Sequence, residues 1–318
     1  MAELVKANKK WKITEGSRTQ RWSEKVIIGG LTVSGLFAVL TVSFVFGFLV
    51  KMSLPAIQQV GLVEYLTGKR WMPTSPNPGY GALPMIFGTT MVSTASLLIA
   101  VPWGIGTALY LSEVAPNKIR EIVKPSLEVL AGIPSVVFGF VALVVVAPKI
   151  ANLFNLSNGI TALTGAIMLG IMALPTIVSI SEDSLNSVPK DYRDAALALG
   201  ATKWQTMIRV TLPAAKSGII AAVMLGFGRA VGETMTVLMA TGNSLAIPLK
   251  EKFGIQLPNY LTSIRTLTAG IAIDASDVPW GSLHYHSLFV LGAMLFVITF
   301  VVNLVADLVL NKGQRRDI

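Results

Sequence analysis

The sequence contains no cysteine and only two histidines. Without a thiol, the chain has no disulfide framework, no thiolate metal site and no cysteine nucleophile. His284 and His286 alternate at the entrance to an apolar segment and have no thiolate beside them. We therefore expect an interfacial pair of histidines, with no metal site and no catalytic residues.

Charged residues are scarce as well. They make up 14% of the chain, against roughly 25% in soluble domains, while 53% of the residues are hydrophobic and the mean hydropathy is +0.64. Water is therefore not the main solvent of this chain. Because a span needs ~20 apolar residues, 318 residues hold several spans but hardly a further soluble catalytic domain.

Six charge-poor stretches predict six membrane-spanning helices, because backbone in hydrocarbon must satisfy its own hydrogen bonds. The stretches cover residues 26–50, 82–112, 129–147, 160–181, 212–242 and 287–306. The sequence therefore predicts an all-α polytopic membrane protein, with a basic arm at 1–25, a membrane domain at 26–311 and a tail at 312–318. Pro102, Pro134 and Pro175, which lie inside these stretches, predict kinks. Residues 261–273 predict a helix lying on the membrane surface.

The net charge of +9 has a topological explanation. Most of the Lys and Arg residues fall in the arm, in the tail and in the alternate loops that face the same side as both. Such residues concentrate in cytoplasmic loops. We therefore expect a multi-pass protein of the cell (inner or plasma) membrane with both termini cytoplasmic, whose surroundings are the lipid bilayer and not nucleic acid.

The inner segment of residues 182–213 predicts a helix-turn-helix that projects from the membrane. Ala and Leu favour a short helix, Gly200 can end it, and Pro213 suits the start of the next helix. Small residues allow a partner to approach closely and to push on the segment. The alternative is a merely amphipathic cytoplasmic connector.

Arg229 and Glu233 lie four residues apart inside the fifth predicted span. On one helix they share a face and can pair, and a cost of about 2.5 to 3.5 kcal/mol for a central charge argues against facing lipid. Gly228 and Gly232 form a small-xxx-small ridge beside them, which allows another helix to approach. The residues alone leave open whether the pair fixes helix register or lines a substrate path.

Glu128 precedes the apolar part of the third predicted span. It is either a further pathway group or a solvated acid at a helix start, where the helix dipole favours a negative charge.

Two motifs carry a resemblance to a known family. The spacing of Asp194-Ala195-Ala196, Gly200 and Leu212-Pro213 resembles the "EAA" coupling loop of ABC importer permeases, with Asp in place of Glu. The run from Gly228 to Met235, followed by Gly242-Asn243, resembles the signature of phosphate-specific transport permeases, and the C-type subunit fits best. Residues 80–84 and 127–139 support it, and the outer loop at 245–279 is the weakest part.

The resemblance implies a type I ABC importer permease fold, in which Arg229 and Glu233 line the phosphate route. It also implies that Asp194 to Trp204 docks in a groove of an ATPase subunit, less deeply with Asp than with Glu. The implied partners are a second, A-type permease, an ATPase dimer that binds ATP-Mg, and an extracytoplasmic phosphate-binding protein.

No Walker motif occurs in this chain, because six residues separate Gly61 from Gly68 where a P-loop has four, and Arg70 follows Lys69 where a P-loop has Ser or Thr. We therefore expect no cofactor and no enzymatic activity in the chain itself. The alternatives are a permease for sulfate or molybdate, an ion-coupled secondary transporter without an ATPase, and a membrane scaffold without transport.

Overall fold

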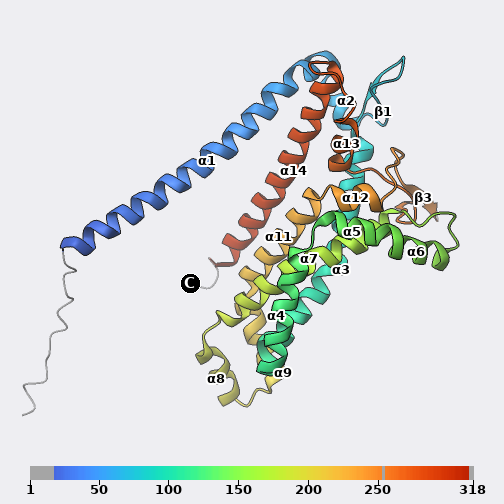
Figure 1. Cartoon of the computed structure of the whole chain (residues 1–318). Coiled ribbons are helices and arrows are strands. Elements are labelled where there is room, and N and C mark those ends of the chain that lie inside the picture. Colours follow the sequence, from blue (N-terminus) through green and yellow to red (C-terminus); the bar gives the residue numbers. More distant parts are fainter. Residues whose placement is uncertain (1–17, 253–254, 315–318) are drawn as a thin grey trace, which may run out of the picture. The chain divides into compact units, whose positions relative to one another are not determined.

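The computed structural model describes residues 18–252 and 255–314 (Figure 1). Most of the predicted arm, residues 1–17, and the end of the predicted tail, residues 315–318, lie outside the described residues. Two units are distinguished, Met1–Phe48 and Leu49–Ile318. Helix α1 (Arg18–Val60) begins in the first unit and ends in the second, so the boundary predicted after residue 25 falls inside a helix.

The second unit is mostly helical, with two short hairpins. Its α-helices are α2 (Leu62–Thr67), α3 (Leu83–Leu109), α4 (Asn117–Gly132), α5 (Ser135–Val141), α6 (Ala147–Phe154), α7 (Ala162–Asn186), α8 (Lys190–Ala198), α9 (Lys203–Thr206), α10 (Leu212–Ala214), α11 (Lys216–Gly232), α12 (Met235–Ala240), α13 (Leu267–Asp274) and α14 (Leu283–Gln314). Short π-helices η1 (Tyr110–Val114), η2 (Ala142–Val146) and η3 (Met207–Thr211) extend or join them. Strand β1 (Trp71–Met72) pairs antiparallel with β2 (Gly79–Tyr80), and β3 (Leu249–Lys252) pairs antiparallel with β4 (Ile255–Pro258).

Five helical segments of the described chain are long and apolar enough to cross a membrane: Lys25–Val60, Leu83–Val114, Ser135–Phe154, Ala162–Asn186 and Leu283–Val305. A sixth span results if the bent pair Lys203–Ala214 and Lys216–Gly232, which meet at 69°, is taken as one. The prediction of an all-α polytopic fold with six spans is confirmed.

The third span differs from its prediction. Helix α4 ends at Gly132, Ile133 is extended with φ −65° and ψ 129°, and the crossing runs from Ser135 to Phe154. Pro134 explains the shift, because a proline disfavours helical backbone at the residue before it. The predicted kink at Pro134 is therefore a break between helices, whereas Pro102 and Pro175 do lie inside α3 and α7.

The fifth span is also interrupted. Helix α11 ends at Gly232, Glu233 is extended with ψ 132°, and α12 begins at Met235. A charge-poor stretch does not reveal this break, because hydropathy reports solvent preference and not backbone continuity. The prediction of one continuous helix over 212–242 is wrong.

Helix α7 lies at the centre of the second unit and packs along α3 and against α11. Small residues make this possible, since a Cβ added to Gly104 of α3 or to Gly226 of α11 would lie 2.7 Å from a side-chain carbon of Ile177. The fully buried Ile177 thus fills the space left by two glycines on different helices.

The predicted surface helix is not on the surface. Helix α13 covers only Leu267–Asp274, and its first four residues are buried against α3 and α14. Gly88 permits this packing, because a Cβ there would lie 2.4 Å from the Arg265 carbonyl oxygen. Alternating apolar and small polar residues mark a buried helix here and not a membrane-surface helix.

Candidate functional site

Arg229 lies in the last turn of α11 and is half-buried between two other helices. Its Nη1 donates to Thr176 Oγ1 of α7 at 3.3 Å, and its Nη2 donates to the Ala131 carbonyl oxygen of α4 at 3.3 Å. A guanidinium has five N–H donors. Within the described chain no carboxylate pairs with Arg229, so most of its donor capacity and its whole charge remain available to an anion.

Glu233 does not pair with Arg229. Its Oε1 accepts from the Thr236 amide at 3.1 Å, and its carbonyl oxygen accepts from Thr268 Oγ1 at 2.8 Å. The prediction that both charges share one helical face is wrong, because the extended backbone at Glu233 takes it off the path of α11. Glu233 instead holds the start of α12 and the start of α13 at the end of α11. The position of Glu233 along a substrate path stays a prediction.

The glycine ridge of α11 faces open space. A Cβ added to Gly228 or to Gly232 would meet nothing within 4 Å, so no other described helix of the second unit packs there. The helix that the ridge predicts is therefore not one of the described helices of the second unit.

Glu128 lies near the end of α4, which begins at Asn117, so it is not an acid at a helix start. Its side chain is exposed, and the described part of the chain gives it no hydrogen-bond or ion-pair partner. The explanation by the helix dipole is therefore wrong, because the dipole favours an acid at the N-terminus of a helix and Glu128 lies near the C-terminus of α4.

The segment from Asp194 to Trp204 forms the predicted helix-turn-helix. Helix α8 ends at Ala198, and Gly200 turns the chain with φ +84°, a value that favours glycine. Thr202 and Gln205 form a capping box that starts α9. Asp194, Ala195 and Gly200 are exposed, Trp204 is 68% exposed, and Ala196 is partly buried.

These two helices lie at one end of the bundle of α3, α7 and α11 (Figure 1). Leu212 and Pro213 lie in α10, at the end of the helical run Lys203–Ala214, and the chain then bends by 69° into α11. Pro213 therefore lies just before this bend and not, as was predicted, at the start of the helix that follows the turn. The exposed turn is therefore a surface that a second protein can reach, and it is connected directly to the helix that carries Arg229.

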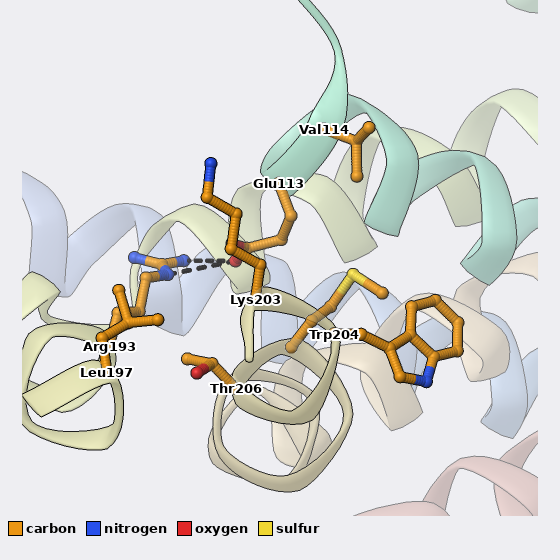
Figure 2. Close-up of a pocket in the computed structure, with 8 residues that line it drawn as sticks. Glu113, Val114, Arg193, Leu197, Lys203, Trp204 and Thr206 are labelled. Carbon is orange, nitrogen blue, oxygen red and sulfur yellow. Dashed lines mark hydrogen bonds and ion pairs between the residues drawn. The ribbon is translucent and has the colours of Figure 1, made fainter. Parts of the chain in front are cut away.

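A cavity of about 350 Å³ lies between this surface and the end of α3 (Figure 2). An ion pair that the sequence analysis missed lies in its wall. Arg193 Nη2 and Glu113 Oε1 are 2.9 Å apart, and the two side chains are only 20% and 18% exposed. The cavity is lined by Glu113, Val114, Arg193, Leu197, Lys203, Trp204, Thr206 and Met207.

A second missed ion pair joins α7 and α4. Glu182 is 1% exposed, and its Oε2 lies 3.0 Å from Lys124 Nζ. Asn186 Nδ2 donates to Glu182 Oε1 at 3.2 Å. Sequence reasoning noted these charges only as loop residues, since a position near a predicted helix end does not say which helix faces it.

Asp274, on α13 and away from the exposed turn, has three polar neighbours. Trp71 Nε1 donates to Asp274 Oδ2 at 2.7 Å, His284 Nε2 lies 3.3 Å from the same oxygen, and Arg265 Nη1 lies 3.7 Å from Oδ1. These four residues line a cavity of about 360 Å³. His286 instead binds the Met52 carbonyl oxygen at 2.7 Å, so the two histidines do not share a site.

Tyr65 of α2 is buried, and its hydroxyl lies 2.7 Å from Ser287 Oγ of α14. Burial raises the pKa of Tyr65 to about 12, and the hydrogen bond from Ser287 offsets part of that rise. Burial also raises the pKa of Tyr80 on the neighbouring hairpin. Both phenols stay neutral at physiological pH and act as hydrogen-bonding and packing groups.

Comparison with known proteins gives a consistent result. Residues 100–315 match the model of the family "Binding-protein-dependent transport system inner membrane component". The chain is 40% identical over 245 residues to "Probable ABC transporter permease protein YqgH" of Bacillus subtilis, covering 77% of this chain and 76% of that protein. It is 33% identical over 321 residues to "Phosphate transport system permease protein PstC" of Haemophilus influenzae, covering 93% and 96%.

Solved structures with a similar fold come from ABC transporters. A bacterial ABC transporter involved in the import of the acidic polysaccharide alginate matches with a TM-score of 0.58 at 15% identity, covering 92% of this chain and 99% of that one. The MetNI methionine ABC transporter in an inward-facing conformation matches with a TM-score of 0.55 at 16% identity, covering 72% and 94%. At these identities the likeness concerns the fold alone.

Proposed function

Because the chain belongs to the family of binding-protein-dependent transport system inner membrane components, we propose that it forms half of the pathway for inorganic phosphate in an ATP-driven importer. The observation that supports an anionic substrate is the environment of Arg229, a half-buried guanidinium without a carboxylate partner in the described chain. An arginine keeps its charge and offers a planar fork that suits a tetrahedral oxyanion.

The chain has no catalytic role in this proposal. A dimeric ATPase binds ATP-Mg and hydrolyses it, and its closure moves the exposed surface from Asp194 to Trp204. An extracytoplasmic binding protein delivers phosphate on the other side, and a second, A-type permease completes the pathway. The protein lies in the inner membrane with both termini in the cytoplasm.

Arg229 binds the anion weakly enough to release it. Two of its N–H groups are already engaged by neutral acceptors, Thr176 Oγ1 and the Ala131 carbonyl oxygen, which hold the guanidinium without neutralising it. We place Glu233 and Glu128 along the same route, where a negative charge repels the anion and limits how long it stays.

The test is phosphate uptake by the complete importer in liposomes, measured together with phosphate-stimulated ATPase activity. We expect uptake to depend on ATP and to fall about tenfold or more in Arg229→Ala, the range for a lost charged hydrogen bond. Lys216→Gln is the matched control, since it removes an exposed charge from the same helix.

The alternatives predict different results. Uptake that persists without ATP would indicate a secondary transporter, and full uptake in Arg229→Ala combined with Glu233→Ala would indicate a scaffold. Stimulation by sulfate or molybdate, with none by phosphate, would change the substrate and keep the rest of the proposal.

A further inference from the structure

Arg193 connects the exposed surface from Asp194 to Trp204, called the coupling surface below, to the membrane helices. It precedes Asp194 on α8, and its Nε donates to Glu113 Oε1 at 3.0 Å. Its Nη1 donates to the Val188 carbonyl oxygen at 3.0 Å, and its Nη2 donates to the Leu185 carbonyl oxygen at 2.8 Å. One guanidinium therefore connects three elements: α8, the end of α7, and η1 at the end of α3. Figure 2 shows its contact with Glu113 of η1.

The contact is built to resist displacement. Arginine presents its donors in a fixed planar fork, so a shift of α8 breaks several bonds together. Both charged partners are largely buried, and a separated charge there would lose its partner without regaining full hydration.

The connection continues to α4 through a second set of charges. Glu182 on α7 pairs with Lys124 on α4 at 3.0 Å. Arg120 on α4 donates through Nε to the Leu111 carbonyl oxygen at 3.0 Å and through Nη2 to the Ser112 carbonyl oxygen at 3.1 Å. The ends of α3, α4 and α7 are thus joined to one another, and Arg193 joins all three to α8.

The same two helices, α4 and α7, hold Arg229. Ala131 is near the end of α4, and Thr176 is in the middle of α7. A movement of α8 that displaces α7 and α4 therefore changes the acceptors around the proposed anion-binding guanidinium. Among the hydrogen bonds and ion pairs of the described residues, Arg193 is the one side chain of α8 that reaches both α7 and η1.

We propose that Arg193, anchored on Glu113, is a positioning residue that transmits movement of the coupling surface to α7 and α4, and so to Arg229. This inference rests on the proposed function. It differs from that proposal in assigning the transmission to a specific ion pair behind the docking surface.

The experiment measures phosphate imported per ATP hydrolysed by the complete importer in liposomes. We expect Arg193→Gln to lower this ratio about 2- to 30-fold, the range for residues that modulate coupling. Arg193→Lys keeps the charge for Glu113 but lacks the fork, and we expect an intermediate ratio. Lys118→Gln is the control, since it removes an exposed charge from α4 that has no partner among the described residues.

A second variant guards against misfolding of the first. Glu113→Gln removes the charge of Glu113 and keeps an acceptor for Arg193. If the pair acts as a unit, Arg193→Gln combined with Glu113→Gln should lower the phosphate imported per ATP no further than the worse single variant does. A smaller amount of assembled complex with an unchanged ratio, or an unchanged ratio in both single variants, overturns the inference. A wild-type importer that takes up no phosphate overturns the proposed function instead.

Discussion

Arg229 and Glu233 illustrate how a helix end changes the partners of two charges four residues apart. On a continuous helix they face each other, but the chain becomes extended at Glu233, and each side chain finds neutral partners instead. Arg229 has no carboxylate partner among the described residues, and Glu233 binds the start of α12 and of α13. Spacing alone could identify the two residues as important, but it could not assign their contacts.

The first prediction concerns Glu233 as an acceptor for the start of α12. Glu233→Ala removes the acceptor of the Thr236 amide, and we expect a loss of about 0.5–2 kcal/mol in the free energy of unfolding, the range for a lost capping group. Glu233→Gln should cost less, because its amide oxygen can still accept. Thermal unfolding of the detergent-solubilised protein measures both.

Glu128→Ala serves as the control for Glu233, since Glu128 is exposed and without a partner in the described chain. We expect its effect to stay within about 0.5 kcal/mol. A Glu233→Gln variant as unstable as Glu233→Ala would mean that the charge matters and not the acceptor.

Among the elements, the membrane spans were the most predictable, because a long charge-poor stretch in a chain this apolar favours hydrocarbon, where the backbone must be helical. The turn at Gly200 was predictable as well, since a glycine after an Ala- and Leu-rich segment commonly ends a helix. The breaks at Pro134 and Glu233 were not. Interior prolines and charges are compatible with either a kink or a break, and packing against neighbouring helices decides between them.

The ion pairs Glu113–Arg193 and Lys124–Glu182 could not be predicted from the sequence, for a related reason. Glu113 and Arg193 are 80 residues apart, and their meeting depends on how α3 and α7 pack. Local spacing predicts the exposed turn between α8 and α9, but the buried contacts behind that turn come from residues distant in the chain.

The second prediction concerns the turn between α8 and α9. Gly200 has φ +84° and open space around it, so a methyl group would clash with nothing and only the backbone conformation would be strained. We expect Gly200→Ala to cost about 1–2 kcal/mol locally. This local destabilisation would appear as faster amide hydrogen exchange in residues 190–206 and as a smaller amount of co-purified ATPase.

Gly106→Ala is the control for that turn. Gly106 lies inside α3 and also has nothing within 4 Å, but its helical backbone accepts alanine. We expect it to be neutral or stabilising by up to about 1 kcal/mol. Equal behaviour of the two alanine variants would show that the Gly200 conformation is not required.

The third prediction concerns the contact between α2 and α14. Tyr65→Phe removes the hydrogen bond to Ser287, and we expect a loss of about 0.5–1.5 kcal/mol in the free energy of unfolding at pH 7. The folded-state pKa of Tyr65 is raised from 10.0 to about 12, so folded Tyr65 keeps its proton at a pH where the unfolded chain loses it.

The stabilisation linked to that proton is complete below pH 10.0 and is lost as the pH rises towards about 12. Tyr65→Phe should therefore lose less stability than the wild type over this interval. Unfolding measured across these pH values, together with ultraviolet detection of phenolate, tests it. A phenolate that forms at the ordinary tyrosine pKa would contradict the buried contact.

The second unit as a whole separates its tasks along its length. One end carries the exposed turn between α8 and α9, and the other end carries α13 and the β1–β2 hairpin (Figure 1). The ion pair of Arg193 lies behind the turn, and Arg229 is held between α4 and α7. In the middle, glycines on α3 and α11 leave room for the side chain of Ile177 on α7, so these three helices pack closely. We therefore expect a movement at the end that carries the exposed turn to reach the middle through these packed helices.

The open side of α11 gives the last prediction. Helices α3, α7 and α14 pack against α11, while no described helix of the second unit covers one face of α11, which presents Leu225, Gly228 and Gly232. Leu225 is 56% exposed. A ridge of small residues flanked by an apolar side chain suits close approach by another helix, and we expect the second permease to supply it.

Gly228→Leu should therefore leave the solubilised chain itself as stable as the wild type or up to about 1 kcal/mol more stable, because leucine favours a helix more than glycine does. It should also reduce the amount of second permease that co-purifies, since the larger side chain fills the approach. Gly106→Leu places the same side chain on an open face of α3 and should leave co-purification unchanged. If both leucine variants retain the partner equally, the ridge of α11 is a lipid-facing surface and the two permeases meet elsewhere.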